Sequence, residues 1–385
     1  FDMKLTIKRA EFLKMLTFAA QAIPGKTAES QYMNFLLVVS QDALDVITSD
    51  GSISSKIHQE REDEKGNEVI LASEEGSIQT PAKLLLDIIS KLGGDIVTLE
   101  LVDSCLLNIS DESSNFNLVT KPGEEYPDVN LNVPEGANGF KVSLADLKSL
   151  FDTTSFAVAV KGPKELYQGI NITALDGRLT FLATDSFRVA SLSKPEASQD
   201  ANFVFTCPVK PLDMITRASE SGEVVIYLDE QKALFVLGKT VISTRLLHGN
   251  FPAIDRLIPP QFPFMIEMKT AEFIERAERV KIISSMDGRN SQVRLNLNKD
   301  SIYLYARSTN FGNSQETFHD VKITMPEDVN VFEIAFNVDF VMEAVKALKS
   351  ETFTLCLSSP TKIFMVKNDD PTNIQIITPI RLSNY

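Results

Sequence analysis

The sequence contains few of the residues from which metal centres and covalent catalytic sites are built. Its 385 residues include three cysteines and three histidines. Cys105, Cys207 and Cys356 are widely scattered, which indicates neither a disulfide framework nor a Cys-x-x-Cys metal site, so we expect inert thiols in a reducing compartment. The histidines lack HExxH or any other metal-ligand spacing. We therefore expect no metal and no cofactor.

Long hydrophobic runs are missing too. No apolar stretch approaches the roughly 20 residues that a membrane-spanning helix needs. The N-terminal residues also lack the apolar segment of a secretory signal. We expect a cytoplasmic protein with no membrane partner.

Signatures of catalysis are absent as well. No GxSxG, GxGxxG or Cys-His pattern occurs. The Gly-Lys-Thr tripeptides at 25–27 and 238–240 look like the end of a P-loop, but Ala20 and Ala233 stand where that motif requires glycine. The acidic run 60–64 is more typical of a solvated loop than of a catalytic pair. The sequence therefore predicts a protein that is not an enzyme.

A strand-then-helix pattern, by contrast, occurs three times. In residues 139–151 an alternating strand leads to Ser143, a candidate N-cap, and then to apolar residues at helical spacing. Similar switches begin at Leu5 and Met265. Near the start of each expected helix stand Ala10, Ala145 and Ala271, which are 135 and 126 residues apart. A repeat that fills the chain outweighs other sequence signals of architecture.

A second strand-helix unit follows in each third of the chain, at 77–89, 203–215 and 332–342. Pro81 and Pro208 are expected in the first turns of their helices, where proline is tolerated. Each third thus reads as β-α-β-β-β twice. This predicts an α+β fold with six helices and largely antiparallel sheets.

Two connectors rich in proline and other turn residues, 121–139 and 249–263, precede copies of the opening motif. They divide the chain into three similar domains, which we place at 1–129, 130–257 and 258–385.

The net charge of −14 argues against a nucleic-acid-binding protein if only the total is considered. The expected helices nevertheless carry 14 Lys and Arg against 12 Asp and Glu, so the remainder of the chain is strongly acidic. The windows are 8–23, 81–92, 143–155, 208–221, 269–285 and 337–351. Either a polyanion faces the helices, or helix surfaces simply tolerate lysine. Both interpretations stay open at this point.

Four local motifs, in order and at repeat-consistent spacing, carry a family resemblance. They are 183–190 (ATDSFRVA), 246–252 (LLHGNFP), 336–341 (FNVDFV) and 377–382 (ITPIRL). With them, residues 3 to about 382 resemble the bacterial DNA polymerase III β subunit family, the sliding clamps. The resemblance implies a head-to-tail ring of two subunits, with helices around a central hole and sheets outside. Such a ring would hold duplex DNA without sequence preference and tether the replicative polymerase.

The resemblance also implies site residues. DNA contacts would fall on Lys26, Lys83, Lys161, Lys210 and Arg217. The homodimer interface would include Phe116, Leu118, Ile282 and Ile283. A peptide groove between the second and third domains would be lined by Tyr167, Thr184, Phe187, Val189, Pro252, Leu257, Asn337, Phe340, Ile376, Thr378, Ile380, Arg381 and Leu382. Its partners would be the polymerase catalytic subunit, a clamp-loading ATPase and repair polymerases. The apolar positions of both surfaces are also compatible with ordinary core.

Three departures from the family pattern affect the groove. Tyr167 and Thr378 stand where smaller or aliphatic groups are frequent, which predicts a shallower and more polar floor. Phe187 takes a position that is commonly histidine. The chain also continues as Ser383–Tyr385, which leaves open whether its end covers part of the groove.

A second interpretation comes from another functional class. A triplicated α+β scaffold that binds proteins without DNA would account for the repeat and the acidic surface. A hydrolase is a distant third, because no catalytic constellation is found.

Overall fold

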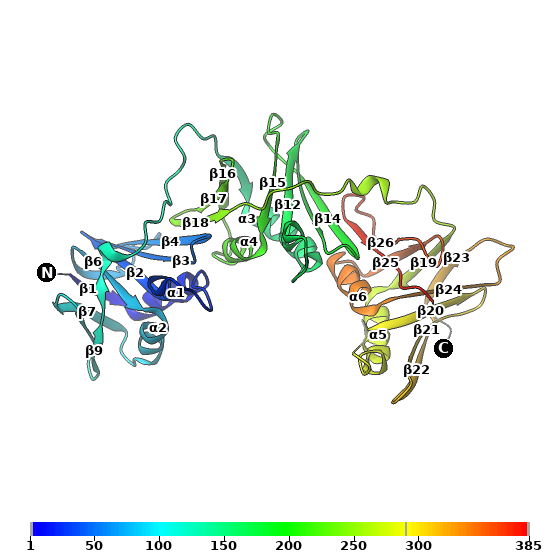
Figure 1. The fold of residues 1–385 in the computed structure, drawn as a ribbon, viewed down its shortest axis with the longest axis horizontal. Coiled ribbons are helices and arrows are strands. Elements are labelled where there is room, and N and C mark those ends of the chain that lie inside the picture. Colours follow the sequence, from blue (N-terminus) through cyan, green and yellow to red (C-terminus); the bar gives the residue numbers. More distant parts are fainter. Residues whose placement is uncertain (1–2, 289–290, 383–385) are drawn as a thin grey trace. The chain divides into compact units, whose positions relative to one another are not determined.

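The computed structural model describes residues 3–288 and 291–382. Within them lie six α-helices, and every strand pairing is antiparallel, so the predicted α+β class and helix number are confirmed (Figure 1). The β-α-β-β-β order occurs twice in each third of the chain, with short additional strands in the first and last thirds.

The first third follows this order closely. Its elements are β1 (Lys4–Lys8), α1 (Arg9–Ala20), β2 (Asn34–Ser40), β3 (Ala43–Ser49), β4 (Ile53–Glu60), β5 (Ile70–Glu74), β6 (Gly76–Pro81), α2 (Ala82–Lys91), β7 (Ile96–Asp103), β8 (Leu106–Ser110), β9 (Asn115–Val119) and β10 (Lys121–Pro122).

The central third has the repeat without additions. Its elements are β11 (Phe140–Ser143), α3 (Leu144–Thr154), β12 (Gly169–Leu175), β13 (Arg178–Thr184), β14 (Arg188–Pro195), β15 (Phe203–Pro208), α4 (Val209–Thr216), β16 (Glu223–Leu228), β17 (Lys232–Leu237) and β18 (Thr240–Arg245).

The last third repeats the order once more. Its elements are β19 (Phe264–Lys269), α5 (Thr270–Ser284), β20 (Gln292–Asn298), β21 (Ile302–Ser308), β22 (Gly312–Phe318), β23 (Val321–Thr324), β24 (Val331–Asn337), α6 (Val338–Ala347), β25 (Thr352–Leu357), β26 (Phe364–Lys367) and β27 (Ile374–Ile377).

The helix starts follow from local sequence. Ser143 caps α3 as predicted, because its Oγ accepts the backbone N–H of Asp146 at 3.1 Å. Pro81 and Pro208 differ slightly from the expectation. Each ends its strand one residue before the helix instead of lying in the first turn, where the missing N–H is equally harmless.

The chain forms two compact units. Unit 1 contains the residues up to Leu147 together with Lys210–Leu246, and unit 2 contains Lys148–Val209 together with the residues from Leu247 onward. The central third contributes to both. In unit 1 a nine-stranded sheet has the order β10-β6-β2-β3-β4-β18-β17-β16-β11, and a five-stranded sheet has the order β5-β1-β7-β8-β9. In unit 2 the sheets are β15-β12-β13-β14-β27-β26-β25-β19-β23 and β22-β21-β20-β24.

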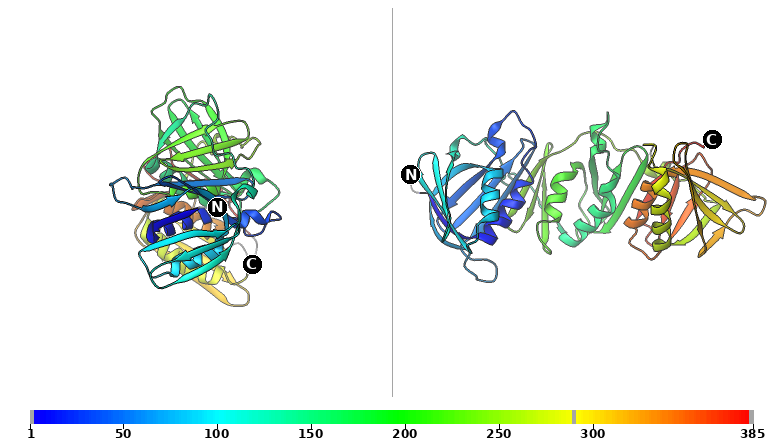
Figure 2. Two further views of the ribbon diagram at one scale, coloured as in Figure 1. Left: turned by 90° about the vertical axis from the view of Figure 1, so that its left-hand side faces the viewer. Right: turned by 90° about the horizontal axis from the view of Figure 1, so that it is seen from below.

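Helix pairs complete each core. Helices α1 and α2 lie side by side in unit 1, and α5 and α6 do so in unit 2 (Figure 2). Phe12 and Leu16 of α1 are fully buried among strand residues such as Leu37 and Leu99, and Phe273 of α5 is buried in the same way. The alternating and helical apolar patterns of the sequence therefore point into these cores.

Each nine-stranded sheet crosses a repeat boundary. In unit 1, β4 of the first third pairs with β18 of the central third, for example Ser55 with Ile242. In unit 2, β14 of the central third pairs with β27 of the last third, with Val189 opposite Ile376. We call each β-α-β-β-β copy a half-unit, so that every third of the chain contains two. Both junctions join the last strand of the first half-unit in one third to the last strand of the second half-unit in the next third.

Candidate functional site

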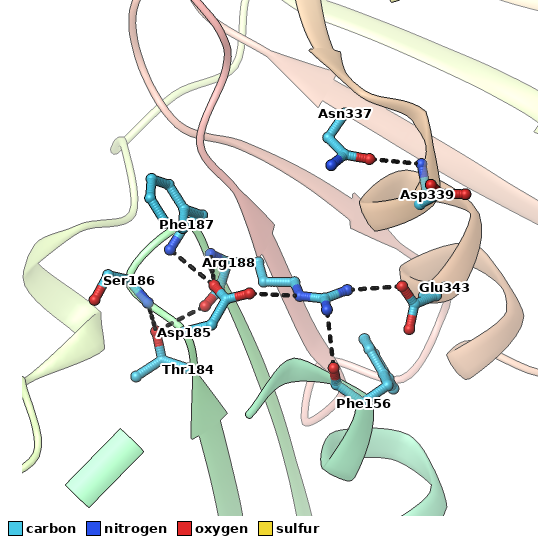
Figure 3. Close-up of polar contacts among 9 residues, drawn as sticks. All are labelled: Phe156, Thr184, Asp185, Ser186, Phe187, Arg188, Asn337, Asp339 and Glu343. Atoms are coloured by element: carbon cyan, nitrogen blue, oxygen red, sulfur yellow. Dashed lines mark hydrogen bonds and ion pairs between the residues drawn. The ribbon is translucent and has the colours of Figure 1, made fainter. Parts of the chain in front are cut away.

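A tight turn between β13 and β14 presents an exposed aromatic ring. The Asp185 carboxylate accepts the backbone N–H groups of Phe187 at 2.9 Å and of Arg188 at 3.0 Å (Figure 3). Ser186 has a φ of 79°, a left-handed conformation that a side chain rarely adopts without such support. The turn leaves the Phe187 side chain 62% exposed.

Arg188 ties this turn to helix α6. Its Nε lies 3.1 Å from an Asp185 oxygen, and its Nη1 lies 3.0 Å from a Glu343 oxygen. Its Nη2 donates to the backbone carbonyl of Phe156 at 2.9 Å, as Figure 3 shows. The guanidinium also covers the ring of Phe340. Arg188 was part of a sequence motif but not of the predicted site. The aspartate three residues before it is the signal that could have identified it.

An apolar cluster lies on the strands beside the turn. Val189 and Ile376 are buried cross-strand partners, and Met365 lies opposite Ile376 on the next strand. Ile254 and Ile258, in and next to the short helical turn Ile254–Arg256, pack on this cluster. The predicted groove residues Val189 and Ile376 are therefore close together and buried.

Further predicted groove residues make contacts of their own in the same unit. The Thr184 hydroxyl is buried and donates to the Arg188 carbonyl at 2.7 Å. The Thr378 N–H donates to the Phe187 carbonyl at 2.9 Å. The Tyr167 ring meets the edge of Phe251, with centroids 5.5 Å apart. Pro252 is exposed, and Leu257 is 47% exposed.

Other predicted groove residues lie at the start of α6 and in the C-terminal segment that pairs with β24 at Ala335. The Asn337 side chain caps this helix by accepting the Asp339 N–H at 2.9 Å. Ile380 bonds to the backbone of Ala335 on β24 at 2.7 Å, and Arg381 and Leu382 follow it on the surface. All thirteen predicted groove residues thus lie in unit 2. Ser383–Tyr385 lie outside the described residues.

The five predicted DNA-contact residues are all exposed. Lys83 and Lys210 occupy the second position of α2 and of α4. Arg217 pairs with Asp213 at 2.9 Å. Lys26 lies in the segment after α1, and Lys161 follows the 3₁₀ turn behind α3.

One of these residues lies in a larger basic hollow. Arg217 lines a hollow of about 610 Å3 beside α1, together with Arg9, Lys14 and Gln21. Sequence reasoning did not single out Arg9, whose guanidinium donates to the carbonyl oxygens of Gly94 and Ile89. Within the observed helix bounds, basic and acidic residues balance, so the negative excess lies outside the helices.

The predicted dimer residues divide by burial. Phe116 on the edge strand β9 is 43% exposed, and Ile282 near the end of α5 is 65% exposed. Leu118 instead belongs to the core of unit 1, and Ile283 packs against the core of unit 2. Exposed residues that sequence reasoning missed are Val119 on β9 and Phe311 before β22.

No cluster of metal ligands occurs within residues 3–288 and 291–382. In the same part of the chain, no helix is both long enough and apolar enough to cross a bilayer. Burial raises the pKa of the Cys207 thiol and that of Cys356, so both stay protonated and unreactive at neutral pH. Cys105 is exposed.

Comparison with protein families gives three consecutive matches. Profiles of the N-terminal, central and C-terminal domains of the DNA polymerase III beta subunit match residues 3–132, 141–253 and 255–381.

Individual relatives are similar over their whole length. The beta sliding clamp of Staphylococcus epidermidis is 27% identical, covering 98% of this chain and 99% of the relative. That of Bacillus subtilis is 26% identical, covering 98% and 100%. Among solved structures, the Bacillus subtilis DNA polymerase sliding clamp superposes with a TM-score of 0.91 at 24% identity, covering all of both chains. A Pseudomonas aeruginosa clamp bound to griselimycin gives 0.88 at 24% identity, covering 99% and 100%.

Proposed function

Because this chain belongs to the DNA polymerase III beta subunit family, it is a sliding clamp without catalytic activity of its own, and we propose that two copies close head to tail around duplex DNA. The alternative of a scaffold that does not act on DNA is not supported, since the relatives are named sliding clamps.

The main support for the ring is a strand pairing that occurs twice, at both boundaries between thirds of the chain. Strand β18 pairs with β4, and β27 pairs with β14, so each second half-unit joins the first half-unit of the preceding third. The equivalent strands that remain are β9 of the first third and β22 of the last, and each is an edge of its sheet. A second copy supplies the missing partner at both ends. Such a head-to-tail contact gives a closed ring of two copies, with two junctions inside each copy and two between the copies. It also covers the two open sheet edges of each copy.

The side chains at these edges support the same pairing. Phe116 and Val119 are exposed on β9, while Ile282 and Phe311 are exposed around β22. Covering large apolar side chains is the main favourable term in stable association. Leu118 and Ile283 support the interface from the cores behind it. We propose domain limits near residues 129 and 257, within the two connectors 121–139 and 249–263 that are rich in proline and other turn residues.

Weak phosphate contacts suit a protein that slides. Lys26, Lys83, Lys161, Lys210 and Arg217 would provide contacts that position the duplex without reading its bases. Because the closed ring itself retains the DNA, a balanced helix surface is sufficient, and a strongly basic one would slow movement.

The groove residues in unit 2 would dock partner peptides. Phe187, Leu257 and Leu382 expose apolar surface in unit 2, which also contains the buried Val189–Ile376 pair. Arg381 and Asn337 add polar groups that can orient a peptide. We propose as partners the polymerase catalytic subunit, a clamp-loading ATPase and repair polymerases, and we place the protein in the cytoplasm where these act.

The ring is tested by retention on DNA. The protein is loaded onto nicked circular DNA, the complex is isolated by gel filtration, and half of the sample is linearised. We expect retention on the circle and rapid loss from the linear molecule, because a closed ring leaves only at an end. Equal release from both forms overturns the proposal.

A further inference from the structure

The outer face of the sheet β22-β21-β20-β24 carries a hollow that the proposed clamp function does not use. Its volume is about 230 Å3, and its lining residues are Arg294, Asn296, Tyr303, Tyr305, Gln315 and Glu333. We propose that this hollow binds bases of single-stranded nucleic acid, which stack on Tyr303 and Tyr305. The proposal does not depend on ring closure.

The strand register places these side chains in adjoining rows. Tyr305 lies opposite Arg294 on β20 and opposite Gln315 on β22. Tyr303 lies opposite Asn296. Directly opposed residues of antiparallel strands point to the same face. The two tyrosines are separated by about 7 Å along β21, a spacing that two successive bases of an extended single strand can span.

The inner face of the sheet is occupied, which leaves the outer face for a ligand. Leu295 of β20 and Leu304 of β21 alternate with the lining residues and are fully buried. Helix α5 packs on β20, β21 and β22. A four-stranded sheet with helices behind it and aromatic residues on a central strand is a common platform for single-stranded nucleic acid.

Both tyrosine rings are available for stacking. They are half-buried, so their positions are restricted. Within residues 3–288 and 291–382, neither ring makes an aromatic, cation–π or side-chain hydrogen-bond contact. The hollow, at about 230 Å3, is smaller than the pockets of about 300 to 1,000 Å3 that hold drug-sized ligands.

The charge of the hollow permits a polyanion. Glu333 is the single acidic residue of the lining, and it is neutralised by Arg294 at 3.0 Å and bonded by Asn296 at 3.4 Å. Arg307, two residues beyond Tyr305 on the same strand face, is exposed. In a chain of net charge −14, such a neutral to basic face is suited to phosphates. Planar amide and guanidinium groups match the edges of bases.

The test measures binding of a short oligonucleotide to the full-length protein. A fluorescein-labelled oligothymidine of about 12 nucleotides, within the size range of single-strand sites, is titrated at low salt and followed by anisotropy. The variant Tyr303→Thr/Tyr305→Thr keeps residues that favour strands but removes both rings. We expect its affinity to fall at least about tenfold, because two bases can no longer stack on an aromatic side chain.

Two matched variants separate stacking from other causes. Tyr303→Phe/Tyr305→Phe keeps the ring faces and should bind within about twofold of the original protein. Tyr227→Thr, at a half-buried position on β16, should bind normally. Unchanged binding by the double threonine variant overturns the proposal. So does failure of the original protein to bind, which is the outcome expected if the hollow serves a peptide.

A second measurement covers the case in which the threonine variant does not fold. The original protein is photocrosslinked to an oligonucleotide that carries 5-iodouracil, and the crosslinked peptide is identified by mass spectrometry. Crosslinks at Tyr303 or Tyr305 support the proposal. Crosslinks confined to other residues contradict it. Neither result affects retention of the protein on circular duplex DNA, so this proposal and the ring can fail independently.

Discussion

The guanidinium carbon of Arg188 lies 4.2 Å from the centre of the Phe340 ring. Arg188 begins β14, whereas Phe340 belongs to α6, and the same guanidinium forms ion pairs with Asp185 and Glu343. One side chain therefore holds both the turn that exposes Phe187 and the helix that carries Phe340. The shape of the proposed peptide groove depends on this contact.

We expect Arg188→Ala to lower the free energy of unfolding of unit 2 by about 2–4 kcal/mol. The reason is that the Asp185 carboxylate, whose side chain is 14% exposed, loses its cation and stays largely buried. Urea unfolding followed by circular dichroism measures the change. Arg217→Ala breaks an ion pair in which the arginine is 71% exposed, and this control should change stability by less than about 1 kcal/mol. If Arg188→Ala and Arg217→Ala lowered the free energy of unfolding equally, Arg188 would have no special structural role.

Peptide binding should depend on exposed groove residues that do not support the fold. Phe187→Ala and Arg381→Ala are each expected to weaken binding of a clamp-binding peptide by about tenfold or more, because interface aromatics and arginines carry much of the binding energy. Fluorescence anisotropy with a labelled peptide measures this. Sedimentation should show an unchanged dimer. Loss of peptide binding and dimer together would indicate misfolding instead of a damaged groove.

Dimer closure should be sensitive to charge at the two proposed contact surfaces. Ile282→Asp, and separately Phe116→Asp, should shift the protein to monomers at micromolar concentration, since a buried carboxylate without a partner is strongly unfavourable. Analytical ultracentrifugation gives the mass. Val160→Asp changes a valine that is 92% exposed elsewhere, and this variant should remain dimeric. A dimer of unchanged strength in all three variants would place the interface on other residues.

Duplex binding should respond to the equivalent helix lysines. Lys83→Glu/Lys210→Glu should weaken binding to a short duplex and reduce the slope of log affinity against log salt by about 2, one unit for each phosphate that the protein no longer neutralises. Titrations at several salt concentrations provide this slope. Lys322→Glu on β23, an exposed position outside the helices, makes the same type of charge change. If Lys322→Glu weakens duplex binding as much per residue as the helix substitutions do, the DNA does not face the helices.

At acidic pH, the Glu316 carboxylate on β22 should no longer contribute to the stability of the folded protein. The hydrogen bond from Arg279 holds the pKa of Glu316 below its ordinary value. A lowered pKa in the folded state means that the ion pair stabilises the protein above the ordinary carboxyl pKa of about 4.3. That stabilisation is lost as pH falls through the lowered value.

Thermal melting of the original protein and of Glu316→Gln should therefore differ at pH 6 and converge in acid. Glu267→Gln, at an exposed position on β19, makes the same change outside the Arg279 ion pair and is the control at pH 6. A difference between the original protein and Glu316→Gln that is as large at pH 3 as at pH 6 would contradict this explanation.

The sequence by itself was sufficient for the repeated architecture. Apolar spacing around Phe12, Leu147 and Phe273 predicted three of the six helices, and the same reasoning identified the other three, because periodicity is a local property of the chain. The groove residues were all predicted from the family resemblance, and they remain predictions of function even though Val189 and Ile376 are neighbours in the structure.

The tertiary structure decided which strands are joined across repeats, and this cannot be read from a local pattern. Pairing of β14 with β27 brings together residues almost 190 positions apart, and only that pairing places Arg188 beside α6. Burial was decided in the same way: Phe116 and Leu118 share one face of the edge strand β9, but only Leu118 is covered by the core of unit 1, whereas Phe116 stays 43% exposed. The physical reason is that a side chain's surroundings depend on strand order and register, which are set by the packing of the whole domain.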